Sequence, residues 1–268
     1  MRLQRLCFLI LPLLTLPAYA DSVNLNSAAN FGVLGGSAVT NTGPTTINGD
    51  LGVYSGSSIT NTNGITINGV PYPGSAIVPN NAGSATAQSD ATAAYGVAAG
   101  LAHTSDLTSQ DLGSVGTLTP GVYKFDSSAG LTGTLTLNFE GLNNAAIVFQ
   151  IGSTLITATG SNVVIENPGL YDEVIWQVGS SATLGTTTAF EGNILALDSI
   201  TLNTGATIGC GSALAQTGAV TLDTNTITTG CNGAAEFTNP PVPEPGSMAL
   251  LSSGLIALVG FVRRRRQS

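Results

Sequence analysis

A repeat of twenty residues is the feature of this sequence that most constrains its fold. Residues 37–49 return as residues 57–69, and residues 200–204 return as residues 220–224. The repeated segments are short runs of β-branched residues separated by Gly and Asn. Short strands that recur at this spacing are typical of a β-solenoid, in which each repeat forms one coil. We therefore expect a mainly β protein.

Alternation within each repeat predicts which side chains face outward. Successive side chains of a strand point to opposite faces, so Leu202 and Leu222 would point into the core. Thr201 and Thr221 would then point outward, and neighbouring coils would place them about 4.8 Å apart. The sequence thus predicts a regular grid of threonine side chains on a flat sheet.

Residues 82–103 depart from the β pattern. This segment is rich in alanine, and Ala91, Ala94 and Ala98 recur at close to helical spacing. The glycines within it weaken a helix, because each costs roughly 1 kcal/mol relative to alanine. We predict one long helix that packs along the solenoid.

The first twenty residues have the organisation of a signal peptide. Arg2 and Arg5 precede an apolar run, which ends in the small-residue cleavage pattern Ala18-Tyr19-Ala20. The run is too short to span a membrane of about 30 Å hydrocarbon thickness. Residues 1–20 are therefore predicted to be removed during export.

Residues 242–268 have the organisation of a sorting signal. Pro243-Glu244-Pro245 precedes an apolar stretch that predicts a transmembrane helix, and four arginines follow on its cytoplasmic side. This tail resembles the PEP-CTERM signal of Gram-negative bacteria. The resemblance implies a transient membrane anchor, processing by an exosortase and release to the cell surface or extracellular matrix. A permanent C-terminal anchor is the alternative. Residues 21–235 would form the solenoid domain and residues 236–241 a linker.

The charge balance excludes several kinds of partner. Apart from Lys124, every Lys and Arg residue of the chain lies in the two terminal segments. A body that is nearly free of cations cannot neutralise phosphates, so we expect no binding to nucleic acid. Adsorption to an anionic membrane surface is disfavoured for the same reason.

Two cysteines remain once the signal peptide and its Cys7 have gone. Cys210 and Cys231 form an even pair in an oxidising compartment, so a disulfide is predicted between them. Two free buried thiols are the alternative.

Several stretches, spread over residues 22–231, resemble one known family. They are residues 30–37 (NFGVLGGS), 119–123 (TPGVY), 148–152 (VFQIG), 174–185 (VIWQVGSSATLG), 192–196 (GNILA), 204–207 (TGAT) and 213–216 (ALAQ). They are similar to the ice-binding domain family of bacteria, microalgae and fungi. The resemblance implies an irregular right-handed β-helix with one long helix beside it. It also implies adsorption to ice.

The same family supplies candidate site residues. Strongly binding members carry a Thr-Ala/Gly-x-Thr/Asn motif on a flat face, and residues 42–45, 159–162 and 204–207 match it here. Residues 181–184 and 217–220 depart from the motif, so its copies do not follow one another on every coil. The candidate ice-binding residues are Thr42, Thr45, Thr159, Asn162, Thr183, Thr204 and Thr207. A rigid array of hydroxyls and methyls would hold a water layer already close to ice.

Catalytic chemistry is not predicted, and neither is a cofactor or a metal. His103 is the only histidine and falls at the predicted end of the helix, and no Cys/His cluster has metal-ligand spacing. Two alternatives stay open. The first is a surface or biofilm-matrix protein that adheres to exopolysaccharide without ice activity. The second is a β-helical enzyme that cleaves polysaccharide with two of the carboxylates Glu166, Asp172, Glu173 and Glu191.

Overall fold

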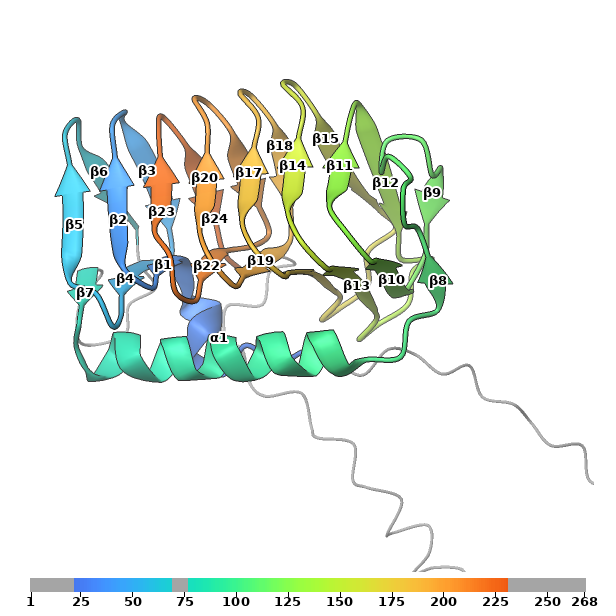
Figure 1. Ribbon diagram of the computed structural model, residues 1–268, viewed down its shortest axis with the longest axis horizontal. Helices are drawn as coiled ribbons and strands as arrows, with labels where there is room; N and C mark the ends of the chain where they lie inside the picture. The colour runs from blue at the N-terminus through green and yellow to red at the C-terminus, as the bar shows by residue number, and fades with distance from the viewer. Residues whose placement is uncertain (1–21, 69–76, 231–268) are drawn as a thin grey trace, which may run out of the picture. The chain divides into compact units, whose positions relative to one another are not determined.

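The computed structural model describes residues 22–68 and 77–230, which form a β-solenoid of three parallel sheets. Each full coil contributes one strand to each sheet (Figure 1). This arrangement confirms the predicted mainly β solenoid. The spacing of twenty residues between repeats is one coil, because Thr40 pairs with Thr60 and Thr201 pairs with Thr221.

Sheet A has nine strands, and the long helix packs along its outer face. In spatial order they are β7 (Ile77–Pro79), β4 (Asp50–Val53), β1 (Phe31–Gly35), β22 (Ala213–Ala215), β19 (Asn193–Ala196), β16 (Glu173–Val178), β13 (Ala146–Ile151), β10 (Gly121–Phe125) and β8 (Ser105–Asp106). Its long strands β1, β13 and β16 are buried almost throughout, as expected for a sheet that is covered on both faces.

Sheets B and C bury one face only. Sheet B contains β11 (Ala129–Leu131), β14 (Leu155–Thr157), β17 (Ala182–Leu184), β20 (Ile200–Leu202), β23 (Val220–Leu222), β2 (Ala38–Asn41) and β5 (Ser58–Asn61). Sheet C contains β6 (Ile65–Ile67), β3 (Thr45–Asn48), β24 (Thr226–Thr228), β21 (Thr207–Gly209), β18 (Ala189–Glu191), β15 (Asn162–Glu166), β12 (Thr134–Asn138) and β9 (Thr117–Leu118). Most strands in both sheets alternate buried and accessible residues, which leaves their outer faces open to solvent.

The order of the coils in space differs from their order in the sequence. The first coils, β1 to β6, lie at one end, and the chain then crosses to β8 at the other end (Figure 1). From there it winds back until β22, β23 and β24 pair with β1, β2 and β3. The first and last parts of the solenoid are therefore neighbours.

The helix α1 (Ala82–Gly100) makes this crossing and runs along sheet A (Figure 1). The side chain of Asn81 accepts a hydrogen bond from the Ser84 backbone amide, and the Ser84 hydroxyl accepts one from the Asn81 backbone amide, which closes a capping box. The predicted helix is confirmed, although it ends three residues early because Leu101 has an extended backbone. A short 3-10 helix, η1 (Asn26–Asn30), packs beside it.

Alanines allow α1 to approach sheet A closely. Ala87, Ala91, Ala94 and Ala98 are buried against the outer apolar face of the sheet. The sheet side chains in this cluster are Leu34, Leu214, Leu195, Ile175, Val148, Ala146 and Val122. Most of the outer face of sheet A is thereby covered, whereas the outer faces of sheets B and C are open to solvent.

A stack of aromatic rings fills the interior. Trp176 is fully buried, and its ring lies parallel to Phe149 with 3.9 Å between centroids. Tyr123 continues the stack on Phe149 at 5.7 Å, and Phe190 packs against Trp176 at 4.8 Å. The indole Nε1 of Trp176 donates a hydrogen bond of 2.9 Å to the carbonyl oxygen of Glu191. Trp176 therefore belongs to the core of the solenoid.

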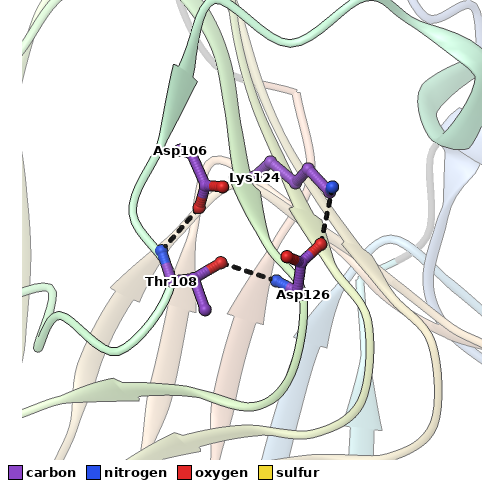
Figure 2. Close-up of polar contacts among 4 residues, drawn as sticks. All are labelled: Asp106, Thr108, Lys124 and Asp126. Atoms are coloured by element: carbon purple, nitrogen blue, oxygen red, sulfur yellow. Dashed lines mark hydrogen bonds and ion pairs between the residues drawn. The ribbon is translucent and has the colours of Figure 1, made fainter.

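Charged side chains gather at the edge of sheet A beside β8. Figure 2 shows Asp106, Thr108, Lys124 and Asp126 in a chain of polar contacts. Lys124 Nζ lies 2.5 Å from Asp126 Oδ1, and this contact raises the pKa of Lys124. Hydrogen bonds from Thr108 lower the pKa of Asp106. Exposed charge on an edge strand opposes pairing with another chain, so this cluster protects the end of the stack.

Several predicted features lie outside the described residues. They are the signal peptide 1–20, Cys231, the motif Pro243-Glu244-Pro245, and the apolar stretch with its arginines. Within residues 22–68 and 77–230, no helix has the length and hydropathy needed to cross a membrane. The Cys210–Cys231 disulfide stays a prediction.

Candidate functional site

Five threonines form a straight row on the outer face of sheet B. Thr183 pairs with Thr201, Thr201 with Thr221, Thr221 with Thr40, and Thr40 with Thr60, always as direct partners in parallel strands. We name this row the sheet B ladder. At about 4.8 Å between neighbouring strands, it spans roughly 19 Å.

The winding order of the chain assembles this ladder. Thr40 and Thr60 come from the N-terminal repeat, whereas Thr201 and Thr221 come from the C-terminal repeat. The two repeats join because β23 pairs with β2, which brings Thr221 beside Thr40 (Figure 1). Two short runs that are far apart in the sequence thereby become one continuous surface.

The ladder hydroxyls have no hydrogen-bond partner among the described residues. No hydrogen bond involves the side chain of any of the five threonines within the part of the chain that the structure describes. None of the seven strands of sheet B contains a charged residue. The hydroxyls are free to bind water, and no ion on these strands competes for that water.

Small side chains border the ladder on one side. Ala38 and Ser58 are direct partners, and the Ser181 and Ser199 hydroxyls each accept a hydrogen bond from a backbone amide of the next coil. Beyond Thr183 the row continues with Ile156, whose side chain is 52% exposed. The ladder is therefore a flat band of threonines that stops at an isoleucine.

The structure places three of the predicted site residues on or beside this face. Thr183 lies in the ladder, and Thr42 is exposed directly after β2. Thr204 is exposed in the turn between β20 and β21, where its hydroxyl donates a hydrogen bond to the Asp223 carboxylate. That hydroxyl is already engaged, so Thr204 offers less to water than the ladder does.

The other predicted residues lie elsewhere. Thr159 is exposed in the turn between β14 and β15, and Asn162 and Thr207 lie on the outer face of sheet C. The glycines of these two motif copies have a structural role, because Gly160 and Gly205 adopt φ values of +70° and +72°. Left-handed backbone of this kind favours glycine. The motif therefore marks the turn between sheets B and C.

The prediction that Thr45 belongs to the ice-binding face is wrong, because its side chain points into the solenoid. It is only 2% exposed, its hydroxyl donates to Asn41 Oδ1 at 2.8 Å, and it accepts from the Asn225 amide at 3.1 Å. In residues 204–207 the last motif residue, Thr207, lies in the outward row of sheet C. In residues 42–45 the last motif residue, Thr45, falls one position before that row, which contains Thr46 instead. A shift of one residue turns a strand side chain to the opposite face.

Thr40, Thr60, Thr201 and Thr221 were not among the predicted site residues, although alternation places Thr201 and Thr221 outward, as the structure confirms. The signal that identifies them is the pair of repeats twenty residues apart. That signal does not show which coils become neighbours.

Two of the four carboxylates considered for polysaccharide cleavage, Asp172 and Glu173, accept hydrogen bonds from backbone amides. Asp172 accepts backbone hydrogen bonds from Ala145 at 2.9 Å and from Gly169 at 2.6 Å. Glu173 accepts one from the Val23 amide at 2.6 Å. In residues 22–68 and 77–230, no three His, Cys, Asp or Glu side chains gather closely enough to hold a metal ion.

Because Glu173 is buried, we expect the protein to be more stable at mildly acidic pH than at mildly alkaline pH. Desolvation by the surrounding protein raises its pKa to about 7 from 4.5, and the Val23 amide opposes this shift only in part. The folded state then holds a proton that the unfolded chain releases between these values. This stabilisation is complete below about pH 4.5 and is lost as the pH rises through about 7. Burial also raises the pKa values of Asp50 and Glu191, which act in the same direction.

Urea unfolding at about pH 5 and about pH 8 measures this effect. We expect the free energy of unfolding to be higher at the lower pH by roughly 1–3 kcal/mol, because a pKa difference of one between the folded and unfolded states corresponds to about 1.4 kcal/mol. Glu173→Gln should remove most of the difference, because a glutamine side chain does not titrate. Its amide oxygen can still accept the hydrogen bond from the Val23 amide, so the fold should be preserved. The exposed residue Glu166 provides the matched variant Glu166→Gln, which should keep the difference. An unchanged pH dependence in Glu173→Gln would contradict this assignment.

Comparison with known proteins gives two matching family models. The model described as ice-binding-like matches residues 33–228, and the PEP-CTERM protein-sorting motif matches residues 241–266. The second match agrees with the predicted sorting signal and indicates export to the cell surface.

Relatives and solved structures agree with the first match. An ice-binding protein of Nostoc sp. (strain HG1) is 48% identical over 254 residues, covering 92% of this chain and 90% of the relative. A crystal structure of an ice-binding protein from an Antarctic biological consortium superposes with a TM-score of 0.70 at 40% identity, covering 80% of this chain and 94% of that chain. The ice-binding protein of the Antarctic ascomycete Antarctomyces psychrotrophicus gives a TM-score of 0.69 at 37% identity, covering 80% and 100%.

The match spans most of the solenoid, including every strand that carries the sheet B ladder. The structural neighbours superpose on most of this chain, and its parallel sheets with one long helix confirm the predicted irregular β-helix. The chain belongs to the ice-binding-like family.

Proposed function

We propose that this protein is exported and binds ice through the outer face of sheet B. The observation that carries the proposal is the sheet B ladder, five threonines in register whose hydroxyls have no partner within the described residues. The relatives with the same fold are named as ice-binding proteins, which supports the proposal.

The proposed mechanism is the ordering of water by a rigid surface. Each threonine presents a hydroxyl that bonds water and a methyl group beside which disordered water is disfavoured. The strands fix these groups before ice arrives, so contact with ice requires little further ordering of the protein or its bound water. Binding of this kind involves no chemical step and no cofactor. We therefore propose that the protein is not an enzyme.

The proposal extends to the processing of the chain. Residues 1–20 are removed on export, an exosortase acts on residues 242–268, and the solenoid remains at the surface of a Gram-negative cell or in its matrix. A disulfide between Cys210 and Cys231 forms in that oxidising setting. Mass spectrometry of the exported protein, with and without reductant, tests both the new termini and the disulfide.

Two measurements on the purified exported protein test ice binding. They are the inhibition of ice recrystallisation and thermal hysteresis. We expect inhibition at micromolar protein that disappears after heat unfolding. A folded protein without either activity would reject ice as the ligand, and binding to matrix exopolysaccharide would then be measured instead.

A further inference from the structure

We propose that sheet C carries a second, shorter surface that contacts ice, formed by Thr66, Thr46, Thr226 and Thr207. These residues are direct partners in adjacent parallel strands, in that order, and we name the row the sheet C ladder. The inference rests on the proposed function of the sheet B ladder. It adds a second site that faces another direction.

The sheet C ladder has the properties that mark the sheet B ladder. None of its four side chains takes part in a hydrogen bond within residues 22–68 and 77–230. All four are partly or fully accessible to solvent. The alternate residues of the same strands, such as Ile47, Ile208 and Ile227, are buried and hold the strands against the core.

The row beside this ladder is neutral and internally bonded. Asn68 Nδ2 donates to Asn48 Oδ1 at 2.9 Å, and Asn48 Nδ2 donates to Thr228 Oγ1 at 2.9 Å. The bond between Asn48 and Thr228 links β3 to β24. The bond between Asn68 and Asn48 links β3 to the residue that directly follows β6. They fix the outer side chains of three neighbouring coils, so the threonines next to them stand on a rigid support.

The sheet C ladder ends where the composition of the sheet changes. After Thr207 the row continues through Ala189, Asn162 and Thr134. Glu191 and Glu166 lie on β18 and β15 in the same part of the sheet. Carboxylates hold their own hydration water, so we restrict the proposed surface to β6, β3, β24 and β21.

The chemistry of this face favours ice over a protein partner. Protein interfaces depend on large apolar or aromatic anchors in their centre. The exposed large apolar side chains of the described residues are Val97, Ile156, Leu170, Tyr171 and Leu197, and none lies on the four strands of the sheet C ladder. The face offers only small neutral side chains, mostly with hydroxyl or amide groups.

The four coils that carry the sheet C ladder also carry four of the five threonines of the sheet B ladder, all except Thr183. Within each coil, β5 leads to β6, β2 to β3, β23 to β24 and β20 to β21. The inner faces of both sheets pack on one common core, so their outer faces point in different directions (Figure 1). A molecule with two such faces can contact two differently oriented ice surfaces, and we therefore expect it to adsorb to more than one crystal plane.

Fluorescence labelling of single ice crystals tests this inference on the purified exported protein. We expect the wild type to label at least two sets of ice planes. The variant Thr46→Tyr/Thr226→Tyr should lose one set, and the sheet B variant Thr40→Tyr/Thr221→Tyr should retain that set. The matched control is Thr134→Tyr, in the same row beyond Ala189 and Asn162, which should label the same planes as wild type.

Circular dichroism and the Tm of each variant show whether the fold is intact. If the tyrosine variant does not fold, Thr46→Val/Thr226→Val removes both hydroxyls while keeping the β-branched shape. The inference is overturned if a folded sheet C variant labels the same planes as wild type, or if the sheet B variant labels none. A folded wild type that labels no plane rejects the proposed function itself, which is a separate result.

Discussion

Thr221→Tyr is expected to lose most of its thermal hysteresis while its fold and Tm remain those of the wild type. Thr221 lies at the centre of the sheet B ladder, between Thr201 and Thr40. A tyrosine ring there would stand above its neighbours and keep the flat row away from the ice surface. We expect roughly a tenfold or greater loss of binding, which corresponds to about 1.4 kcal/mol. A nanolitre osmometer measures the hysteresis directly.

The matched control is Thr136→Tyr. Thr136 is also a central outward residue of a strand, with Thr117 and Val164 as its partners, but it belongs to neither ladder. It should keep wild-type activity. Equal hysteresis in the two variants would show that ice does not contact sheet B at the ladder. Loss of both activity and circular dichroism signal in Thr221→Tyr would trace the defect to folding.

Trp176→Ala is expected to lower the free energy of unfolding by about 3–5 kcal/mol, the range found when a buried tryptophan or phenylalanine is truncated. The indole is fully buried, stacks on Phe149 and packs against Phe190. Truncation leaves a cavity in the centre of the stack. It also leaves the carbonyl oxygen of Glu191 without the hydrogen bond that it accepts from Nε1.

Urea unfolding followed by far-ultraviolet circular dichroism measures this loss, since the chain has a single tryptophan and the variant has none. Trp176→Phe should lose less, because a smaller ring still stacks on Phe149. A loss below about 1 kcal/mol in Trp176→Ala would show that the core closes around the gap, and the stack would then matter little for stability.

The sequence predicts the local structure of this protein well, because local structure follows from local spacing. Alternation places Leu202 and Leu222 inward and Thr201 and Thr221 outward, and the structure confirms all four. The alanine-rich segment predicts α1, and only its last turn differs, because the chain becomes extended at Leu101. Each of these features depends on residues a few positions apart.

The arrangement of the site depends on contacts that no local pattern contains. Thr40 and Thr221 become neighbours through a pairing between strands at opposite ends of the chain. The repeats show that each half has outward threonines, but not that the halves join. The sequence motif also selects Thr45. Its side chain points inward because the motif lies one residue before the outward position of that strand, which Thr46 occupies. Motif matching alone does not detect such a shift.

The pairing of the last coil with the first sets the contact order of the molecule. The hydrogen bond between Asn48 and Thr228 joins residues 180 positions apart, and so does that between Asn225 and Thr45. Until β22, β23 and β24 have emerged from the export machinery, the inner edges of β1, β2 and β3 have no strand to pair with. Folding that depends on such distant contacts is slow. A chain cut short before its last coil would lack Thr221 and would leave open sheet edges between Thr201 and Thr40, so only the complete solenoid joins its two halves into one continuous threonine surface.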